Sequence, residues 1–469
     1  MILGLVLWGL APVTTGASAR DLTLSQGIDL AVAHDPETQD AKRREEIGKL
    51  KRSKAVQDFL PKIDFYLVSG PQTDYFGRPI TDKSVFYEGF GLEQPLWKGG
   101  TLTNTVKLAE SETRRQHWDY LSKKLNVAAD TIKAYYQVLT AQAVIEQYAA
   151  LLAQGEEDLR EAQSRLEAGR ATRAEVLDLQ VKLLEVQQKL SKARADYQVQ
   201  VSGLKKLTGL GEEERLSLVR QYPLEDIRAN LDSLLYEAQG KRPDLKSGRE
   251  EVAYNQLKTE IEKGKRWPQL SFVGRYEWEN PTFMVGKKDW LVMLKATVSF
   301  GNTTLSYSPE RTQLYPNIYA FPTDILNPFT PLRTFAFSVH SVKYSVFDRS
   351  SNKVELAEAQ AGRDLAQGRW DQLQRQIYYD VKDANTQRED SQARIVTAEK
   401  QIILGRELLA ITRTKFTSGY ATLADVFKAR ATLAEAQVNL LTAQNDKAVA
   451  LGKLYKALGR DLMFQGSGS

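Results

Sequence analysis

Two stretches of the chain repeat one another: residues 165–178 read RLEAGRATRAEVLD and residues 415–428 read KFTSGYATLADVFK. The match continues without a gap over 165–209 and 415–459, at an offset of 250 residues and with fifteen identities in forty-five positions. A second offset, of 207 residues, relates earlier positions, pairing Leu24, Ala31, Pro36, Pro61 and Phe65 with Leu231, Ala238, Pro243, Pro268 and Phe272. The second copy therefore holds an insertion of 43 residues. A tandem duplication of this kind predicts one supersecondary unit used twice.

The composition leaves little room for catalysis. No cysteine occurs, so the chain has no disulfide, no thiolate nucleophile and no cysteine metal site. Three histidines (His34, His117 and His340) lie far apart, no His/Asp/Glu cluster has metal-ligand spacing, and no phosphate-binding glycine loop is present. The 64 basic and 59 acidic residues are interleaved, which is typical of solvated helical faces and not of a nucleic-acid-binding stripe. We expect no enzyme activity, no cofactor, no metal and no nucleic-acid partner.

The first residues are interpreted as a secretory signal. A short apolar stretch over 1–12 precedes Ala17-Ser18-Ala19, a small-residue cleavage site, which predicts a signal peptide over 1–19. No later segment reaches the ~18 uncharged apolar residues of a membrane-spanning helix. Residues 461–469 are interpreted as a tail outside the fold.

Each copy is predicted to run helix, strand, strand, very long helix, reversal, long helix. In the first repeat, 20–210, the predicted elements are a helix over 23–58, strands about 61–70 and 85–96, and a helical hairpin over 101–208. In the second repeat, 211–460, they are strands about 269–278, 290–300 and 335–347 and a hairpin over 349–458. The hairpins have the composition of coiled coils, and their longest helices should measure roughly 100 Å.

The two hairpin reversals share one pattern: a glycine for a left-handed helix end, a threonine as the next N-cap, and an acid three residues later, as in a capping box. Its members are Gly169, Thr172 and Glu175 in the first copy and Gly419, Thr422 and Asp425 in the second. This pattern predicts tight hairpins with tips at Gly169 and Gly419.

The predicted strands alternate between an apolar face with aromatic ends and a polar face, as residues 290–300 illustrate. Strands of ~9–11 residues with one apolar face suit a membrane barrel as well as a soluble sheet. Four strands cannot close a barrel, because the smallest barrels use eight. Their open edges would need partners, so a barrel should be shared among subunits.

Several short motifs in a fixed order carry a family resemblance. They are the Leu24, Ala31 and Asp35-Pro36 opening, the strand entries at Pro61 and Pro268, the junction Pro95-Leu96-Trp97-Lys98-Gly99-Gly100, and the twin reversals. With the duplicated element order, they make about 21–460 resemble the TolC-type outer-membrane efflux family. The second junction, 345–350, keeps Phe-Asp but lacks the proline and glycines, and the lack of cysteine removes the lipid-anchor site of some relatives.

The resemblance implies an α+β membrane protein, a homotrimer whose strands form one shared β-barrel in the outer membrane. Long coiled coils continue it as a periplasmic α-helical barrel. Such a chain would be the exit duct of a tripartite efflux or type I secretion system, in contact with outer-membrane lipid, a periplasmic adaptor protein and an inner-membrane pump. The sequence does not decide the cargo. The alternative from another class is a soluble periplasmic coiled-coil scaffold with a small sheet.

The resemblance also implies roles for acids near the tips. Asp425 matches an acidic ring that makes the family's periplasmic entrance cation-selective, a use of charged rings expected in pores. Glu175 is its counterpart in the first copy, and Lys428 stands where relatives carry a second acid. The plain alternative is that both acids only cap helices.

The exposed tips are expected to contact the adaptor. They comprise Gly169 with Arg170 in the first hairpin and Gly419 with Tyr420 in the second. Because the two tips differ at the second residue, the two grooves would not be equivalent. The alternative is that these glycines serve only the turns.

The insertion, 301–345, leaves two arrangements open. Either 303–308 and 335–346 form an extra hairpin, adding two strands per subunit, or 301–334 is a proline-rich loop outside the barrel. Five of the fifteen prolines fall in 309–331, which argues against a helix or a central strand there. We favour the hairpin with an extracellular loop over 309–334, although 303–308 is short for a membrane crossing.

Overall fold

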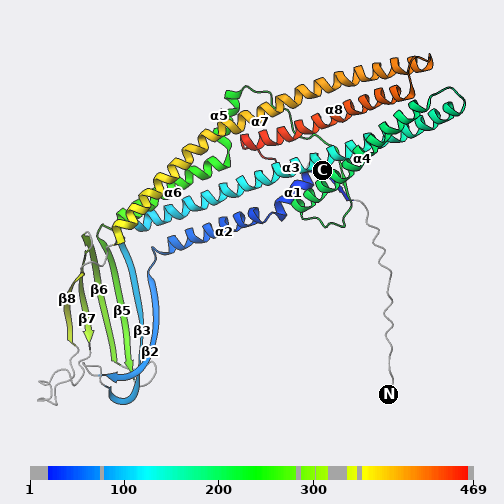
Figure 1. Cartoon of the computed structure of the whole chain (residues 1–469). Coiled ribbons are helices and arrows are strands. Elements are labelled where there is room, and N and C mark those ends of the chain that lie inside the picture. Colours follow the sequence, from blue (N-terminus) through cyan, green and yellow to red (C-terminus); the bar gives the residue numbers. More distant parts are fainter. Residues whose placement is uncertain are drawn as a thin grey trace, which may run out of the picture. The chain divides into compact units, whose positions relative to one another are not determined.

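The structure, a computed structural model, describes residues 20–73, 79–280, 287–300, 303–314, 335–345 and 351–462 (Figure 1). The chain divides into two compact units. The helical unit comprises residues up to Ala41, 120–243 and from Gln374 onward, and the strand unit comprises 42–119 and 244–373. The predicted signal peptide and residues 463–469 of the predicted tail lie outside the described residues. Leu462, which belongs to the predicted tail, is instead 1 % exposed and packs in an apolar core that includes Leu22 and Leu24.

The helices repeat with the two offsets read from the sequence. At 207 residues, α1 (Leu24–His34) matches α5 (Leu231–Lys241), and α2 (Pro36–Gln57) matches α6 (Pro243–Gly264). At 250 residues, α3 (Thr101–Glu167) matches α7 (Ser351–Thr417), both of 67 residues, and α4 (Arg173–Thr208) matches α8 (Leu423–Leu458), both of 36 residues. Among the described residues, no helix has both the length and the apolar character required to cross a membrane.

The single helix predicted over 23–58 is wrong, because the chain breaks at Asp35 into α1 and α2. A residue before proline is disfavoured in the helical region, and Asp35 is extended, with φ −65° and ψ 119°. The Asp35 carboxylate then accepts hydrogen bonds from the Thr38 backbone N–H and hydroxyl, both at 2.7 Å. Pro36 starts α2, where its missing N–H has no cost.

A small parallel sheet that the sequence did not predict lies in the helical unit. It joins β1 (Arg20–Leu22) to β4 (Leu216–Leu218). The Tyr135 hydroxyl on α3 lies 2.9 Å from the Leu22 carbonyl oxygen and 2.6 Å from that of Val219. Burial raises the pKa of Tyr135 to about 12, so the hydroxyl keeps its proton as a donor. The single phenol proton is therefore shared between the last residue of β1 and the residue that follows β4, which ties this end of the small sheet to α3.

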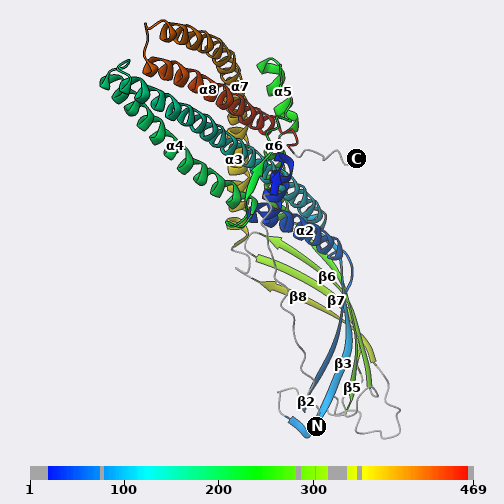
Figure 2. The same cartoon turned by 90° about the vertical axis from the view of Figure 1, so that its right-hand side faces the viewer.

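The large sheet of the strand unit has six antiparallel strands in the order β2-β3-β5-β6-β7-β8 (Figure 2). The strands are β2 (Lys62–Thr73), β3 (Pro79–Lys98), β5 (Gln269–Asn280), β6 (Lys287–Phe300), β7 (Thr303–Leu314) and β8 (Phe335–Ser345). The insertion therefore supplies the β7–β8 hairpin, which is the arrangement favoured from the sequence. Residues 315–334, within the predicted extracellular loop, lie outside the described residues.

Two expectations about β7 are wrong. The strand extends beyond 308 to Leu314, and it is central even though it contains Pro309. Pairing with β6 is interrupted only opposite Ser308 and Pro309, while the register on either side is unchanged. The missing proline N–H is therefore accommodated by a local gap in one ladder, and the pairing with β8 is continuous.

The two faces of this sheet differ in chemistry and exposure. One face carries large exposed apolar side chains, among them Phe65 (55 %), Phe90 (47 %), Val342 (65 %) and Tyr344 (64 %), with Glu88 as a buried charged exception. The opposite face carries buried hydroxyl side chains, namely Ser271, Thr304 and Ser308. A soluble sheet would bury its apolar face. This sheet exposes it.

Candidate functional site at the helical hairpin tips

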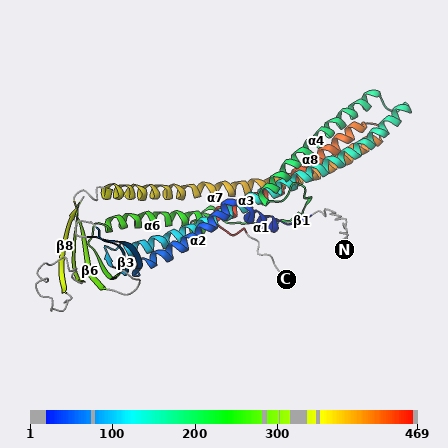
Figure 3. The same cartoon turned by 90° about the horizontal axis from the view of Figure 1, so that it is seen from below.

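Both hairpins of the helical unit reverse through the same motif (Figure 3). Gly169 has φ +68° and Gly419 has φ +78°, which is the left-handed region that favours glycine. The N–H after each glycine bonds back across the last turn: Arg170 to the Arg165 carbonyl oxygen and Tyr420 to that of Lys415, both at 2.8 Å. A Cβ at either glycine would meet no atom within 4 Å. Within one chain, glycine is therefore required by the positive φ of the turn and not by a lack of room for a side chain.

The caps of the two return helices are not equivalent. Asp425 completes a capping box, because its N–H donates to the Thr422 hydroxyl at 3.2 Å and its carboxylate accepts from the Thr422 N–H at 2.9 Å. In the first copy, the Glu175 N–H donates to Thr172 at 3.2 Å, but the reciprocal bond is missing. The capping box expected at Glu175 is thus only half formed. Among the described residues, its carboxylate has no hydrogen bond or ion pair.

The charges around Asp425 are mixed. Hydrogen bonds from the Thr422 backbone and hydroxyl hold the pKa of Asp425 below its usual value, and the nearby charges of Lys182 and Lys428 lower it further. Lys182 in turn forms an ion pair with Asp178. Asp425 is therefore ionised at neutral pH, but the field of its carboxylate is partly offset by two lysines.

The two tips line a common groove of about 360 Å³ within the helical unit. Five of the seven residues singled out from the sequence line it: Arg170, Glu175, Gly419, Tyr420 and Asp425. Gly169 and Lys428 do not line the groove. Tyr420 is 85 % exposed, which makes it the most exposed large apolar side chain of the two tips.

An apolar cluster joins the hairpins directly behind the tips. It includes Leu151 and Ala162 from α3, Leu179 and Leu183 from α4, and Phe427 from α8, which is 1 % exposed. The lone glycine of α3, Gly155, belongs to this packing, because a Cβ there would collide with Leu183 and lie 2.5 Å from the Phe427 ring. The requirement for glycine at this position depends on side chains of the other helices, so it could not be predicted from the sequence.

Two further side-chain contacts, an ion pair and a cation–π contact, also connect the first hairpin to the second. Arg430 of α8 donates to Asp158 of α3 at 2.5 Å, with side chains only 15 % and 13 % exposed. Burial raises the pKa of Asp158 even though Arg430 opposes the shift. About two turns nearer the tip on α3, the Arg165 guanidinium lies 4.3 Å from the centre of the Phe416 ring. Neither contact was predictable from the sequence, because the residues of each pair lie more than 250 positions apart.

Comparison with known proteins identifies the family. The profile of the family described as "Outer membrane efflux protein" matches residues 27–210 and 331–460. The chain belongs to this family. Over 196 residues it is 26 % identical to the alkaline protease secretion protein AprF of Pseudomonas aeruginosa, a match that covers 41 % of this chain and 40 % of that protein. The chain thus spans less than half the length of this curated relative.

Solved structures of outer-membrane proteins share the fold of this outer membrane efflux protein. The CmeC channel of Campylobacter jejuni has a TM-score of 0.71 at 15 % identity, covering 95 % of this chain and 87 % of that one. VceC of Vibrio cholerae has a TM-score of 0.70 at 16 % identity, covering 94 % and 96 %. The open state of MtrE from Neisseria gonorrhoeae has a TM-score of 0.69 at 17 % identity, covering 94 % and 89 %. At these identities the likeness concerns the fold alone.

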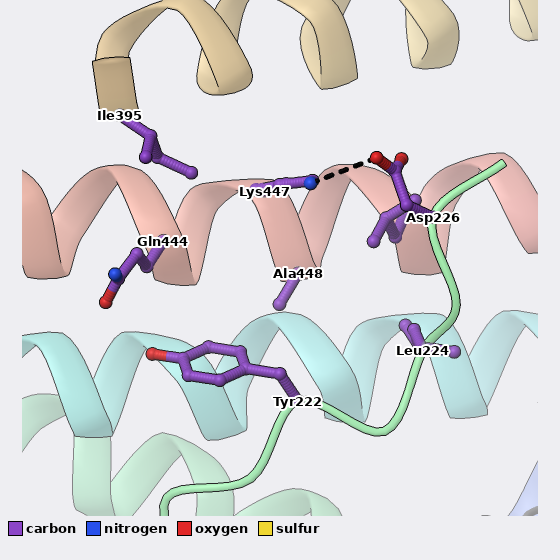
Figure 4. Close-up of a pocket in the computed structure, with 8 residues that line it drawn as sticks. Tyr222, Leu224, Asp226, Ile395, Gln444, Lys447 and Ala448 are labelled. Carbon is purple, nitrogen blue, oxygen red and sulfur yellow. Dashed lines mark hydrogen bonds and ion pairs between the residues drawn. The ribbon is translucent and has the colours of Figure 1, made fainter. Parts of the chain in front are cut away.

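A second pocket of this efflux family protein, of about 260 Å³, lies under the segment that joins the two repeats (Figure 4). There Asp226 accepts from Arg388 of α7 and Lys447 of α8, both at 3.2 Å. Burial raises the pKa of Asp226, but the bonds from Lys447 and Arg388 lower it overall. Tyr222 donates to Asn445 at 2.8 Å. These bonds attach the segment to the second hairpin, and no sequence motif predicted this attachment.

Proposed function

We propose that three copies of this chain form an outer-membrane exit duct, a passive conduit from the periplasm to the outside. The observation that carries the proposal is the six-stranded sheet, which has an exposed apolar face and whose two edges are unpaired within the described part of the chain. Lipid tails would cover that face, and strands of other copies would pair with the edges, because a bilayer offers no water to unpaired backbone groups. Six strands are also fewer than the eight of the smallest closed barrels.

The helical unit supports an assembly of several copies. Its exposed large aliphatic side chains lie on α4 and α7, and they are Leu177, Val181, Leu184, Val199, Val396, Ile403, Leu404, Leu408 and Ile411. α3 and α8 have no such exposed side chain among the described residues. Apolar stripes at helical spacing on two helices of one unit are expected where neighbouring copies pack together. In this arrangement, α4 of one copy would lie against α7 of the next, and the helices would form a periplasmic tube.

At the entrance of the tube, each copy would place Asp425, Glu175 and Lys428 near its narrow end. Three copies would bring six carboxylates together, three of them within capping boxes and three free of hydrogen bonds among the described residues. A ring of acids attracts cations. Because Lys182 and Lys428 offset the charge of Asp425, we propose a modest cation preference.

The partners would be a periplasmic adaptor protein and an inner-membrane pump, with the adaptor seated on the tips around Arg170 and Tyr420. The name of AprF, a protease secretion protein, and the efflux family name together leave export of proteins or of small molecules as the two cargo classes. A soluble periplasmic scaffold does not account for the exposed apolar face of the sheet.

Ion selectivity in planar bilayers tests the entrance. Asp425→Asn should reduce the cation preference measured from the reversal potential in a salt gradient, with Glu175→Gln as the matched variant outside a complete capping box. Both variants should still form channels. An unchanged reversal potential, together with a lowered thermal midpoint in Asp425→Asn only, would leave Asp425 a capping role and remove the acidic entrance from the proposal.

A further inference from the structure

The β7–β8 hairpin contributes an edge of the sheet. In the described chain β8 pairs only with β7, and β2 at the other edge pairs only with β3 (Figure 1). Building on the duct proposed above, we propose that β8 of one copy pairs with β2 of the next copy. The insertion then forms the subunit interface within the membrane, and each copy contributes six strands. Three copies would close an eighteen-stranded barrel, instead of the twelve strands that copies without the hairpin would give.

The strand directions permit this closure. Five successive antiparallel pairings link β2 to β8, so the two edge strands run in opposite directions. When β8 meets β2 of another copy in a symmetric ring, that pairing is therefore antiparallel as well. Each copy contributes an even number of strands, as in bacterial outer-membrane barrels built from one chain.

The observed register limits how the edges can meet. One row of directly opposed residues starts at Lys62 and runs across the sheet through Glu93, Val273, Met293 and Glu310 to Val339. In a ring of identical copies, this row continues into β2 of the next copy, where position 339 faces a residue that comes after position 62. We call the number of residues between position 62 and that residue the advance. The advance must be even, because an odd advance would bring the apolar face of one edge onto the polar face of the other.

Strand tilt selects among the even advances. With a rise of about 3.3 Å per residue and about 4.8 Å between strands, advances of four, six, eight and ten residues over six strands give tilts of about 25°, 35°, 42° and 49°. Closed barrels have tilts of about 35–45°. Only advances of six and eight fit, so position 339 should oppose position 68 or 70.

Either register brings two unpartnered charges together. Lys343 would lie directly opposite Asp64 after an advance of six, and diagonally across from Asp64, opposite Tyr66, after an advance of eight. Both charged side chains are exposed, and among the described residues neither has an ion pair. They lie on the polar face, next to Val342 and Tyr344 on β8 and to Ile63 and Phe65 on β2, which lie on the apolar face. In either register, the charged side chains of the two edges therefore meet on the polar face, while their apolar side chains meet on the apolar face.

The absence of cysteine allows a direct test by disulfide cross-linking in outer membranes. Directly opposed residues in antiparallel strands have Cα atoms about 4.5–5.5 Å apart, within the range that a disulfide spans. Lys343→Cys should be combined with Asp64→Cys or Tyr66→Cys, with Phe65→Cys, on the opposite face, as the matched control. A separate pair, Lys295→Cys with Asp64→Cys, reports an interface made by β6 instead.

The expected result is a ladder of linked dimers and trimers on non-reducing gels for Lys343→Cys with one or both polar-face partners, and monomer for Phe65→Cys and for each single cysteine. A ladder through Lys295→Cys would overturn the proposal and keep the duct with four strands per copy. A link between positions 343 and 64 or 66 within one chain, or no link at all from position 343, would also overturn it. Channel formation by the same variants reports separately on the duct itself.

Discussion

Removing the Asp158 carboxylate should loosen the hairpin tips more than any exposed charge change nearby. The substitution Asp158→Ala leaves the Arg430 guanidinium enclosed, with a side chain 15 % exposed and its Nε already without a hydrogen-bond partner in the described chain. Removing one partner of a fully buried ion pair costs about 3–5 kcal/mol. Because this pair retains some contact with solvent, we expect about 2–4 kcal/mol.

The assay is amide hydrogen exchange of the detergent-purified protein, followed in α3 around the tip. A loss of 2–4 kcal/mol corresponds to roughly 30- to 800-fold faster exchange where local opening controls the rate. Glu161→Ala is the matched control, because it removes an ion pair to Arg165 whose side chains are 41 % and 49 % exposed. That change should cost at most about 1 kcal/mol.

A double substitution separates lost charge pairing from lost packing. Burial raises the pKa of Asp158, so desolvation of the carboxylate outweighs the help that it receives from Arg430. Asp158→Leu combined with Arg430→Met should therefore recover most of the protection, since apolar residues of similar volume often replace buried pairs without loss. If Asp158→Ala accelerates exchange no more than Glu161→Ala does, the pair is not what holds the two hairpins together.

Two further predictions concern the adaptor and pH. Arg170→Glu with Tyr420→Glu should abolish export while leaving assembly and membrane insertion intact, whereas normal export in cells would refute the adaptor contact at the tips. Glu237, held by two 2.8 Å bonds from Arg460, has its pKa lowered to about 2, chiefly by those bonds. A carboxyl with a lowered pKa stabilises the fold above its ordinary pKa and ceases to do so as pH falls through the lowered value. The difference in unfolding free energy between the native chain and Glu237→Gln should therefore be at most about 3 kcal/mol at pH 6 and should vanish as the pH falls from 4.5 to 2. A difference that does not change with pH would contradict the role of this ion pair.

The features that follow from local backbone rules were predictable. Gly169 and Gly419 had to adopt positive φ because each ends a helix that reverses, and the offset of 250 residues made the two sites support each other. The break at Asp35 obeyed an equally local rule, that of the residue before proline, but helical periodicity continues through it and concealed the break. The half-formed cap at Glu175 shows that the same motif in two copies need not make the same bonds.

Features that depend on distant partners were not predictable. Pro309 argued against a central strand, yet β7 tolerates it because the neighbouring ladder opens for two residues, which depends on the register with β6. Arg430 and Asp158 are two of 123 interleaved charges, and nothing in one sequence distinguishes a pair separated by 272 positions. The attachment of Asp226 to Arg388 and Lys447 depends likewise on the packing of two helices.

The most direct test of the central claim is the mass of the particle extracted from outer membranes, measured by native mass spectrometry in detergent. The account predicts that the protein leaves the membrane only with detergent and has three times the mass of one mature chain. A monomer released by buffer without detergent would contradict the shared barrel and favour a soluble periplasmic scaffold.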